Sequence, residues 1–269
     1  MKVVAICYDF DKTLGSKGSC LDHGYLEDLN LNSDEFWVEV NKTRNKYNLE
    51  DALGYMYYTI KKSAELGKPI TKEKLESYGE KLTYYNGVET WFERVNNYAK
   101  NKGIMLEHYL ISSGLKEVLD KCSIAKYFKK IYACSYLYND KNEPIWPANI
   151  VNYTSKTQYL YRIKKNILDE NDPKVNDKQI NKRIPFENMI YVGDSSTDIP
   201  CMSIVSKNKG HSIGIYEPKK KELMLNLFNN KRINYYCLAD YSEGSEMEKT
   251  VFSIIDKIKL REKEKTKNL

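Results

Sequence analysis

The chain has 269 residues, of which 41% are hydrophobic, and its 43 basic and 37 acidic side chains give a net charge of +6. This length can bury a core without disulfide or metal support, and the mild charge, with no stripe of arginines between aromatics, argues against a nucleic-acid-binding surface. No apolar run approaches the roughly 20 residues that span a membrane, so we expect neither a signal peptide nor a membrane contact.

The first part of the chain predicts one strand and then a run of helices. Residues 2–9 are apolar and rich in β-branched side chains, as in a buried strand. Helical patterns follow, in which Ser33 and Thr71 are the predicted N-caps. These patterns cover residues 32–48, 49–66, 71–82 and 87–103. Because no clear strand separates them, they indicate a helical insert.

From residue 104 onward, predicted strands alternate with helices. Residues 131–151 predict a small β-hairpin, Thr154 can cap the next helix, and residues 167–184 are polar and expected to be exposed. Further strands are predicted at 104–114, 188–194, 211–218 and 233–240, and helices at 115–122, 155–166 and from about Ser242. This alternation is typical of an α/β protein with a doubly wound, Rossmann-like parallel sheet. Such a sheet binds ligands beyond the carboxyl ends of its strands.

Short polar or charged side chains stand where these strands end or where a helix begins. They are Asp9 and Asp11 in "DFDKT", Ser112 in "LISSG", Lys156 in "TSKTQ", and Asp194 and Asp198 in "VGDSSTD". Each feature alone has a structural explanation, because aspartates suit turns, a serine can cap a helix, and a lysine is usually solvated. Their joint order favours one shared site at the sheet edge.

With these four motifs the chain resembles the haloacid dehalogenase-like (HAD) hydrolases. The family's motifs read here as "DFDKT" at 9–13, "ISSG" at 111–114, Lys156, and "GDSSTD" at 193–198, so the resemblance spans the whole chain. The helical insert and the small hairpin are similar to those of the phosphoserine phosphatase branch. The resemblance implies a catalytic core formed by 1–16 and 104–269, an inserted α-helical cap domain at 17–103, and the hairpin at 131–151.

Two neighbouring carboxylates can divide a phosphoryl transfer between attack and proton transfer. Asp9 can attack phosphorus and form an aspartyl-phosphate. Asp11 points to the same side of an extended chain, where it can protonate the leaving oxygen and then activate water. The sequence therefore assigns the two catalytic roles to these two residues.

A hard divalent cation fits the remaining carboxylates. Asp9 and Asp194 offer oxygen ligands, and the resemblance adds Asp11 through its backbone carbonyl. No histidine or cysteine stands near, which favours Mg²⁺ over zinc. We expect Asp198 to support the metal site from behind the ligands, with direct ligation as the alternative.

The phosphate oxygens need hydrogen-bond donors and a fixed positive charge. Ser112 and Lys156 can supply a hydroxyl, an N–H and a cation. The resemblance adds Ser113 and Gly114 of the second motif. Thr13 is expected to stabilise the loop and contact phosphate, although a turn-capping role explains it equally well.

A metal-dependent phosphatase acting on a small phosphomonoester is thus the leading hypothesis. A carbon–halogen hydrolase would not need an acid at Asp11, and an ion-pumping ATPase would need membrane segments. A non-catalytic binding protein could have lost a motif residue, yet all are present. A phosphomutase or other phosphotransferase remains the alternative, because the same intermediate can pass its phosphoryl group to an alcohol.

The sequence identifies neither the substrate nor the oligomeric state. The partner is expected to be a small phosphorylated metabolite, and Trp37, Lys42, Arg44 and Glu50 in the cap each have a surface or core explanation beside a substrate role. The six cysteines form neither a CxxC pair nor a zinc spacing, so reduced thiols in a cytoplasmic protein are expected. Both a monomer and a homodimer are compatible with the sequence.

Overall fold

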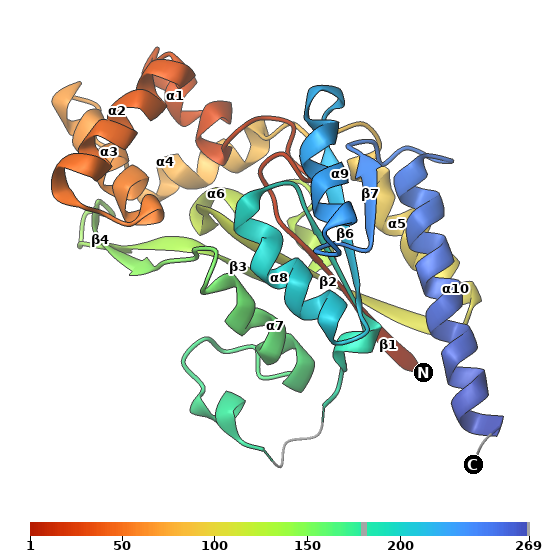
Figure 1. Cartoon of the computed structure of the whole chain (residues 1–269). Coiled ribbons are helices and arrows are strands. Elements are labelled where there is room, and N and C mark those ends of the chain that lie inside the picture. Colours follow the sequence, from red (N-terminus) through yellow and green to blue (C-terminus); the bar gives the residue numbers. More distant parts are fainter. Residues whose placement is uncertain (179–181, 268–269) are drawn as a thin grey trace.

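The computed structural model describes residues 1–178 and 182–267, and its centre is one seven-stranded sheet (Figure 1). The strand order is β4-β3-β2-β1-β5-β6-β7, and every pairing is parallel except that of β3 with β4. The strands are β1 (Lys2–Tyr8), β2 (Ile104–Leu115), β3 (Phe128–Tyr138), β4 (Pro144–Asn149), β5 (Met189–Gly193), β6 (His211–Tyr216) and β7 (Tyr235–Leu238). The predicted doubly wound parallel sheet is confirmed, and β3 with β4 forms the predicted hairpin at its edge.

The central strand β1 is buried because both of its neighbours are strands. Its residues from Val4 to Tyr8 are fully buried, between β2 on one side and β5 on the other. The chain crosses from β1 to β2 in one direction and later returns to β5 in the other, which makes the carboxyl end of β1 the switch point of the sheet. Ligands of open α/β sheets bind at such a point.

Helices cover both faces of the sheet (Figure 1). Among them α5 and α10 pack on each other, and α8 packs on β5 and β6. These helices are α5 (Val88–Asn101), α6 (Lys116–Leu119), α7 (Lys156–Lys165), α8 (Ile199–Lys207), α9 (Lys221–Asn229) and α10 (Glu246–Lys267). The predicted helix 115–122 is shorter, because β2 runs on to Leu115. Within the described parts of the chain, no helix combines the length and apolar character needed to cross a bilayer.

The remaining helices form a group of their own, at the upper left of Figure 1, toward which β1 runs. They are α1 (Tyr25–Asp28), α2 (Ser33–Tyr47), α3 (Asp51–Glu65) and α4 (Lys72–Ser77). Thr71 caps α4 as predicted, but Asn32 rather than Ser33 caps α2, since its side chain accepts the backbone N–H of Glu35. Thr154 does not cap α7; the residue at the N-cap position is Ser155, and the side chain of Asn152 accepts the N–H groups of Thr154 and Ser155 just before the helix.

The helix α5 lies on the sheet rather than in this helical group. Its residues Trp91 and Phe92 are fully buried, the helix packs on β2 and α10, and the indole of Trp91 donates to the hydroxyl of Tyr8 at 2.9 Å. The C-terminal part of the predicted cap range 17–103 thus packs on the sheet. An amphipathic helix buries one face whether it packs on the sheet or in the helical group, so the pattern of 87–103 alone could not distinguish the two positions.

Two short segments join the helical group to the sheet, and they pair with each other. Ser16 donates its N–H to the carbonyl of Thr83 at 3.0 Å, and Tyr85 donates to the carbonyl of Leu14 at 3.0 Å. Within the predicted exposed segment 167–184, residues 179–181 lie outside the described structure, as do residues 268–269 of the predicted core. The described remainder is mostly exposed but ends at the buried Ile184.

A buried carboxylate at the amino end of β2 stabilises the sheet, and its effect should depend on pH. Burial by itself would raise the pKa of Glu107, but hydrogen bonds from Arg183, Lys129 and Tyr109 outweigh it and hold the value at about 2, against an ordinary 4.5. Because the folded-state pKa is lowered, this stabilisation is complete above the unfolded-state pKa and is lost as pH falls toward 2.

We therefore expect Glu107→Gln to lower the free energy of unfolding at pH 7 by about 1 kcal/mol. The difference from the unsubstituted protein should shrink as pH falls from about 5 toward 2. Urea unfolding across this pH range measures it. Glu39→Gln, at an exposed pair with Lys42, is the matched control and should change stability by less than about 0.5 kcal/mol. A difference for Glu107→Gln that is independent of pH would contradict this account.

Candidate active site

The loop after β1 places Asp9 at the switch point of the sheet. The N–H of Asp9 donates to the carbonyl of Val192 in β5 at 2.9 Å, so the strand pairing continues to this residue. The chain then turns sharply, with the N–H groups of Thr13, Leu14 and Gly15 all donating to the carbonyl of Phe10. This turn holds the residues that follow Asp9 close above the sheet edge.

A buried lysine joins two of the predicted aspartates. The Nζ of Lys156 lies 2.9 Å from Oδ1 of Asp9 and 2.8 Å from Oδ1 of Asp198. Lys156, Asp9 and Asp198 are 1%, 6% and 0% exposed, respectively, and Lys156 is 147 residues from Asp9 in sequence. Burial alone would lower the pKa of Lys156, but the charges of Asp198 and Asp9 outweigh it and raise the pKa. The lysine therefore carries a fixed positive charge.

Asp198 is held by donors on both of its oxygens. Its Oδ1 accepts from Lys156 and from the hydroxyl of Tyr191 at 2.8 Å, and its Oδ2 accepts from the N–H and hydroxyl of Ser195. Asp9, Asp194 and Asp198 each have an atom within 4.8 Å of the others, which is a suitable grouping for a metal ion. Because the oxygens of Asp198 already have partners, its placement suits the expected supporting position.

The other carboxylates of the site lie close to one another, and their pKa values are raised. Burial, followed by the nearby Asp9 and Asp198, raises the pKa of Asp194 to about 8. Burial also raises the pKa of Asp9 to about 6, against the opposing charge of Lys156. Burial and then Asp9 raise the pKa of Asp11 well above its usual range. A divalent cation would offset this crowding, and the set contains only hard oxygen donors, so these residues fit Mg²⁺.

Asp11 has a feature that structural packing does not explain. Its Oδ1 is buried and, among the described residues, has no hydrogen-bond partner. A buried carboxyl oxygen without a partner costs free energy, roughly 1–3 kcal/mol. Such a group at a sheet edge is suited to meeting a ligand.

The second predicted motif lies beside the first, since β1 and β2 are neighbours with Tyr8 paired to Leu110. Ser112 is fully buried, and its hydroxyl accepts the N–H of Gly114 at 3.0 Å. It does not cap α6, which begins four residues later. The carbonyl of Ser113 accepts from the hydroxyl of Tyr55 in α3 at 2.7 Å, a contact between the helical group and the sheet edge.

Thr13 is buried, and its carbonyl accepts from the hydroxyl of Tyr241 at 2.9 Å. Its own hydroxyl has no partner among the described residues, so turn capping does not account for it. The neighbouring Lys12 adopts a left-handed conformation, with φ of 55°, and pairs with Glu217 at 3.1 Å. The hydroxyl of Tyr85 also donates to Glu217. The motifs could not predict this contact, the pairing of Lys12 with Glu217, or the hydrogen bond from Tyr241 to Thr13.

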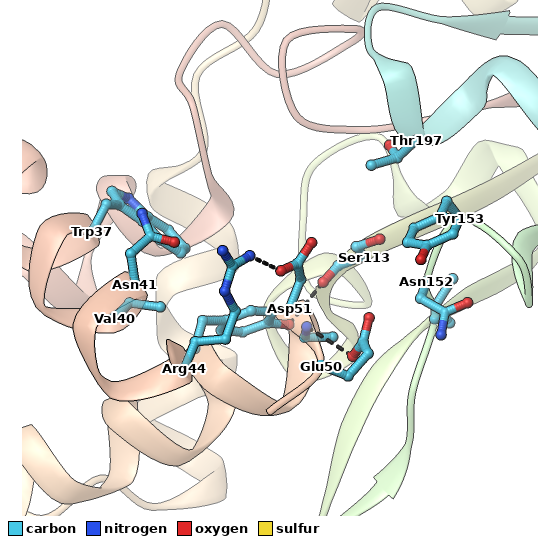
Figure 2. A pocket seen from close by; sticks show the side chains of 13 residues that line it. Trp37, Val40, Asn41, Arg44, Glu50, Asp51, Ser113, Asn152, Tyr153 and Thr197 are labelled. Carbon is cyan, nitrogen blue, oxygen red and sulfur yellow. Dashed lines mark hydrogen bonds and ion pairs between the residues drawn. The ribbon is translucent and has the colours of Figure 1, made fainter. Parts of the chain in front are cut away.

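A cavity of about 280 Å³ lies between the helical group and this edge of the sheet (Figure 2). Trp37 and Arg44 of α2 and Tyr55 of α3 line one side, and Ser113 and Thr197 line the other. Ser113 and Thr197 are direct sequence neighbours of Ser112 and Asp198. The cavity therefore borders the predicted site.

No model of a protein family matches the chain. A curated protein of Borreliella burgdorferi, itself uncharacterised, is 24% identical over 274 residues, with 91% of this chain and 94% of that protein covered. This relative carries no functional description, so the fold comparisons are the more informative ones.

Among solved structures, a HAD family hydrolase from Salmonella enterica subsp. enterica serovar Typhi is 18% identical with a TM-score of 0.57. The match covers 86% of this chain and 66% of that chain. A probable phosphoserine phosphatase from Vibrio cholerae is 11% identical with a TM-score of 0.61, over 97% and 67% of the two chains. A phosphoserine phosphatase in apo form is 18% identical with a TM-score of 0.54, over 87% and 93%. The chain thus has the fold of these proteins.

Proposed function

We propose that the chain is a Mg²⁺-dependent phosphatase of the HAD type, which hydrolyses a small phosphomonoester through an aspartyl-phosphate on Asp9. The observation that carries this proposal is the buried Lys156 held between Asp9 and Asp198, with Asp194 beside them, at the switch point of the sheet. A purely structural explanation does not require four ionisable side chains, three of them buried, at the one edge where ligands of this fold bind.

In the proposed reaction, a carboxylate oxygen of Asp9 attacks phosphorus while the bond to the substrate alcohol breaks. Asp11 gives its proton to the departing oxygen. Asp11, now ionised, then takes a proton from water, whose oxygen attacks phosphorus and releases inorganic phosphate and free Asp9. The raised pKa of Asp11 supports this role, because it lets the carboxyl keep its proton to a higher pH than an ordinary aspartate.

The other residues hold the transferring group in place. Lys156 and the hydroxyl of Ser112, with the backbone of Ser113 and Gly114, are proposed to contact the phosphate oxygens, as is Thr13. Asp9, Asp194 and the carbonyl of Asp11 would hold Mg²⁺, which neutralises negative charge on the phosphoryl group when bound. Asp198 keeps Lys156 and Tyr191 in position.

We further propose that residues 17–84 form the cap over this site, shorter than the range expected from the sequence. The pairing of Ser16 with Thr83 and of Tyr85 with Leu14 makes the two connecting segments a natural hinge. Closure would exclude water from the phosphoryl group, and opening would release phosphate.

Phosphate release from a panel of phosphorylated metabolites and p-nitrophenyl phosphate tests this function. We expect turnover with Mg²⁺ and a fall of about 10²-fold or more with excess EDTA, because the metal contributes several kcal/mol to such a transfer. Restoring Mg²⁺ should restore the rate. Turnover that is insensitive to EDTA would contradict the metal site, and transfer to an added alcohol with no phosphate released would identify a phosphotransferase instead.

A further inference from the structure

The cavity beside the site is placed to hold the alcohol part of a substrate. Ser113 lies near the carboxyl end of β2 and Thr197 follows β5 (Figure 2), so the cavity borders the same sheet edge as Asp9. With a phosphoryl group on Asp9, the remainder of a phosphomonoester would extend toward α2 and α3. At about 280 Å³ the cavity is at the small end of ligand sites, which limits this remainder to a few heavy atoms.

The charged residues of the cavity leave an excess of negative charge. Arg44 is paired with Asp51, so its positive charge is already neutralised. Glu50 uses Oε2 to accept the N–H groups of Ala52 and Leu53, and its Oε1 has no partner among the described residues. One carboxylate oxygen thus remains to meet a cation.

Aromatic rings form two sides of the same cavity. Trp37 and Tyr55 lie edge to face, with ring centroids 6.1 Å apart, and both line the cavity from the helical group. Tyr153 lines it from the other side and is 51% exposed (Figure 2). The faces of tryptophan and tyrosine rings attract ammonium groups, and quaternary ammonium ligands are commonly bound between such rings.

We propose that this cavity selects a phosphomonoester whose short alcohol carries an ammonium group. The paired rings of Trp37 and Tyr55 would face the cation and Glu50 would balance its charge, with Tyr153 on the opposite wall (Figure 2). This inference rests on the proposed phosphatase function and adds the substrate class to it. A primary and a quaternary ammonium share this chemistry, so O-phosphoethanolamine and phosphocholine are the two probes that distinguish them.

The experiment compares kcat/KM of the full chain with Mg²⁺ for phosphocholine, O-phosphoethanolamine, O-phospho-L-serine, glycerol 3-phosphate and p-nitrophenyl phosphate. We expect at least one of the two ammonium esters to exceed the uncharged glycerol ester by about tenfold or more. A clear preference for phosphocholine would mean that the aromatic rings contribute most of the selectivity. A preference for O-phosphoethanolamine would mean that Glu50 contributes most of it.

Two substitutions test the residues. Glu50→Gln keeps an oxygen that can cap α3 but removes the charge, and Trp37→Ala removes a ring. Each should lower the ratio of kcat/KM for the ammonium ester to that for glycerol 3-phosphate by about tenfold. Glu39→Gln and Trp146→Ala, at exposed positions outside the cavity, are the matched controls and should leave this ratio unchanged.

The outcomes separate this inference from the function on which it rests. Hydrolysis of p-nitrophenyl phosphate without any ammonium preference would overturn the inference alone. A preference for O-phospho-L-serine over O-phosphoethanolamine that Arg44→Gln removes would also overturn it, because Arg44 would then bind a carboxylate. Failure to hydrolyse every ester would overturn the phosphatase function and the inference together.

Discussion

Replacing Asp9 by asparagine is expected to lower turnover of p-nitrophenyl phosphate by about 10⁴-fold or more, because the amide cannot form the covalent intermediate. The fold should survive, since the side chains are nearly the same size and the amide oxygen can still accept from Nζ of Lys156. Steady-state kinetics together with the thermal unfolding midpoint measure the two effects. A folded Asp9→Asn variant that keeps more than about a tenth of the activity would contradict attack by Asp9.

Asp120→Asn provides the matched control for this substitution. Asp120 is an exposed carboxylate that pairs with Lys116 on the same helix turn. Its removal should leave turnover unchanged and change stability by less than about 0.5 kcal/mol. Rapid mixing adds a second measurement, because a burst of p-nitrophenol is expected in the unsubstituted protein if hydrolysis of the intermediate is slower than its formation, and none with Asp9→Asn.

The position of the site could be predicted because several local signals agree. Apolar runs before Asp9 and Asp194 indicated buried strands, and parallel strands bring their carboxyl ends to one edge. The structure places Asp9, Asp194, Asp198 and Lys156 together there. Their separation in sequence did not matter, because the strand order around β1 determines which residues lie together at this edge.

The partners of these residues could not be predicted. Asp198 reads in sequence as one more carboxylate after a turn, and only the structure gives it Lys156, Tyr191 and Ser195 as donors. The same holds for α5, whose Trp91 finds the hydroxyl of Tyr8 across 83 residues. Tertiary contacts of this kind leave no local pattern.

The candidate substrate residues of the helical group could not be sorted from the sequence either. Trp37, Arg44 and Glu50 line the cavity, whereas Lys42 is 67% exposed and pairs with Glu39 on the surface. All four stood in similar helical sequence, where the turn of the helix alone decides which face meets the sheet edge. Tyr153, on the opposite wall, lies in a loop that carried no signal.

Replacing Asp11 by asparagine should separate proton transfer from attack. An alkyl alcohol needs a proton to leave, whereas p-nitrophenolate is a stable anion that does not. We therefore expect Asp11→Asn to lower kcat/KM for an alkyl phosphomonoester by about 10²- to 10⁴-fold and to lower it much less for p-nitrophenyl phosphate. The second ester serves as the internal control for folding and for phosphate binding.

The pH dependence of the rate tests this prediction independently. Burial raises the pKa of Asp11, so in the unsubstituted protein this carboxyl keeps its proton to a higher pH than an ordinary aspartate and loses it as pH rises through that pKa. The rate with an alkyl ester should fall on this alkaline side, and the fall should be absent in Asp11→Asn. Water activation also depends on Asp11, so the aspartyl-phosphate should accumulate in the variant and appear as a larger burst of p-nitrophenol. Equal losses on both esters with an unchanged pH profile would mean that Asp11 positions the site without transferring a proton.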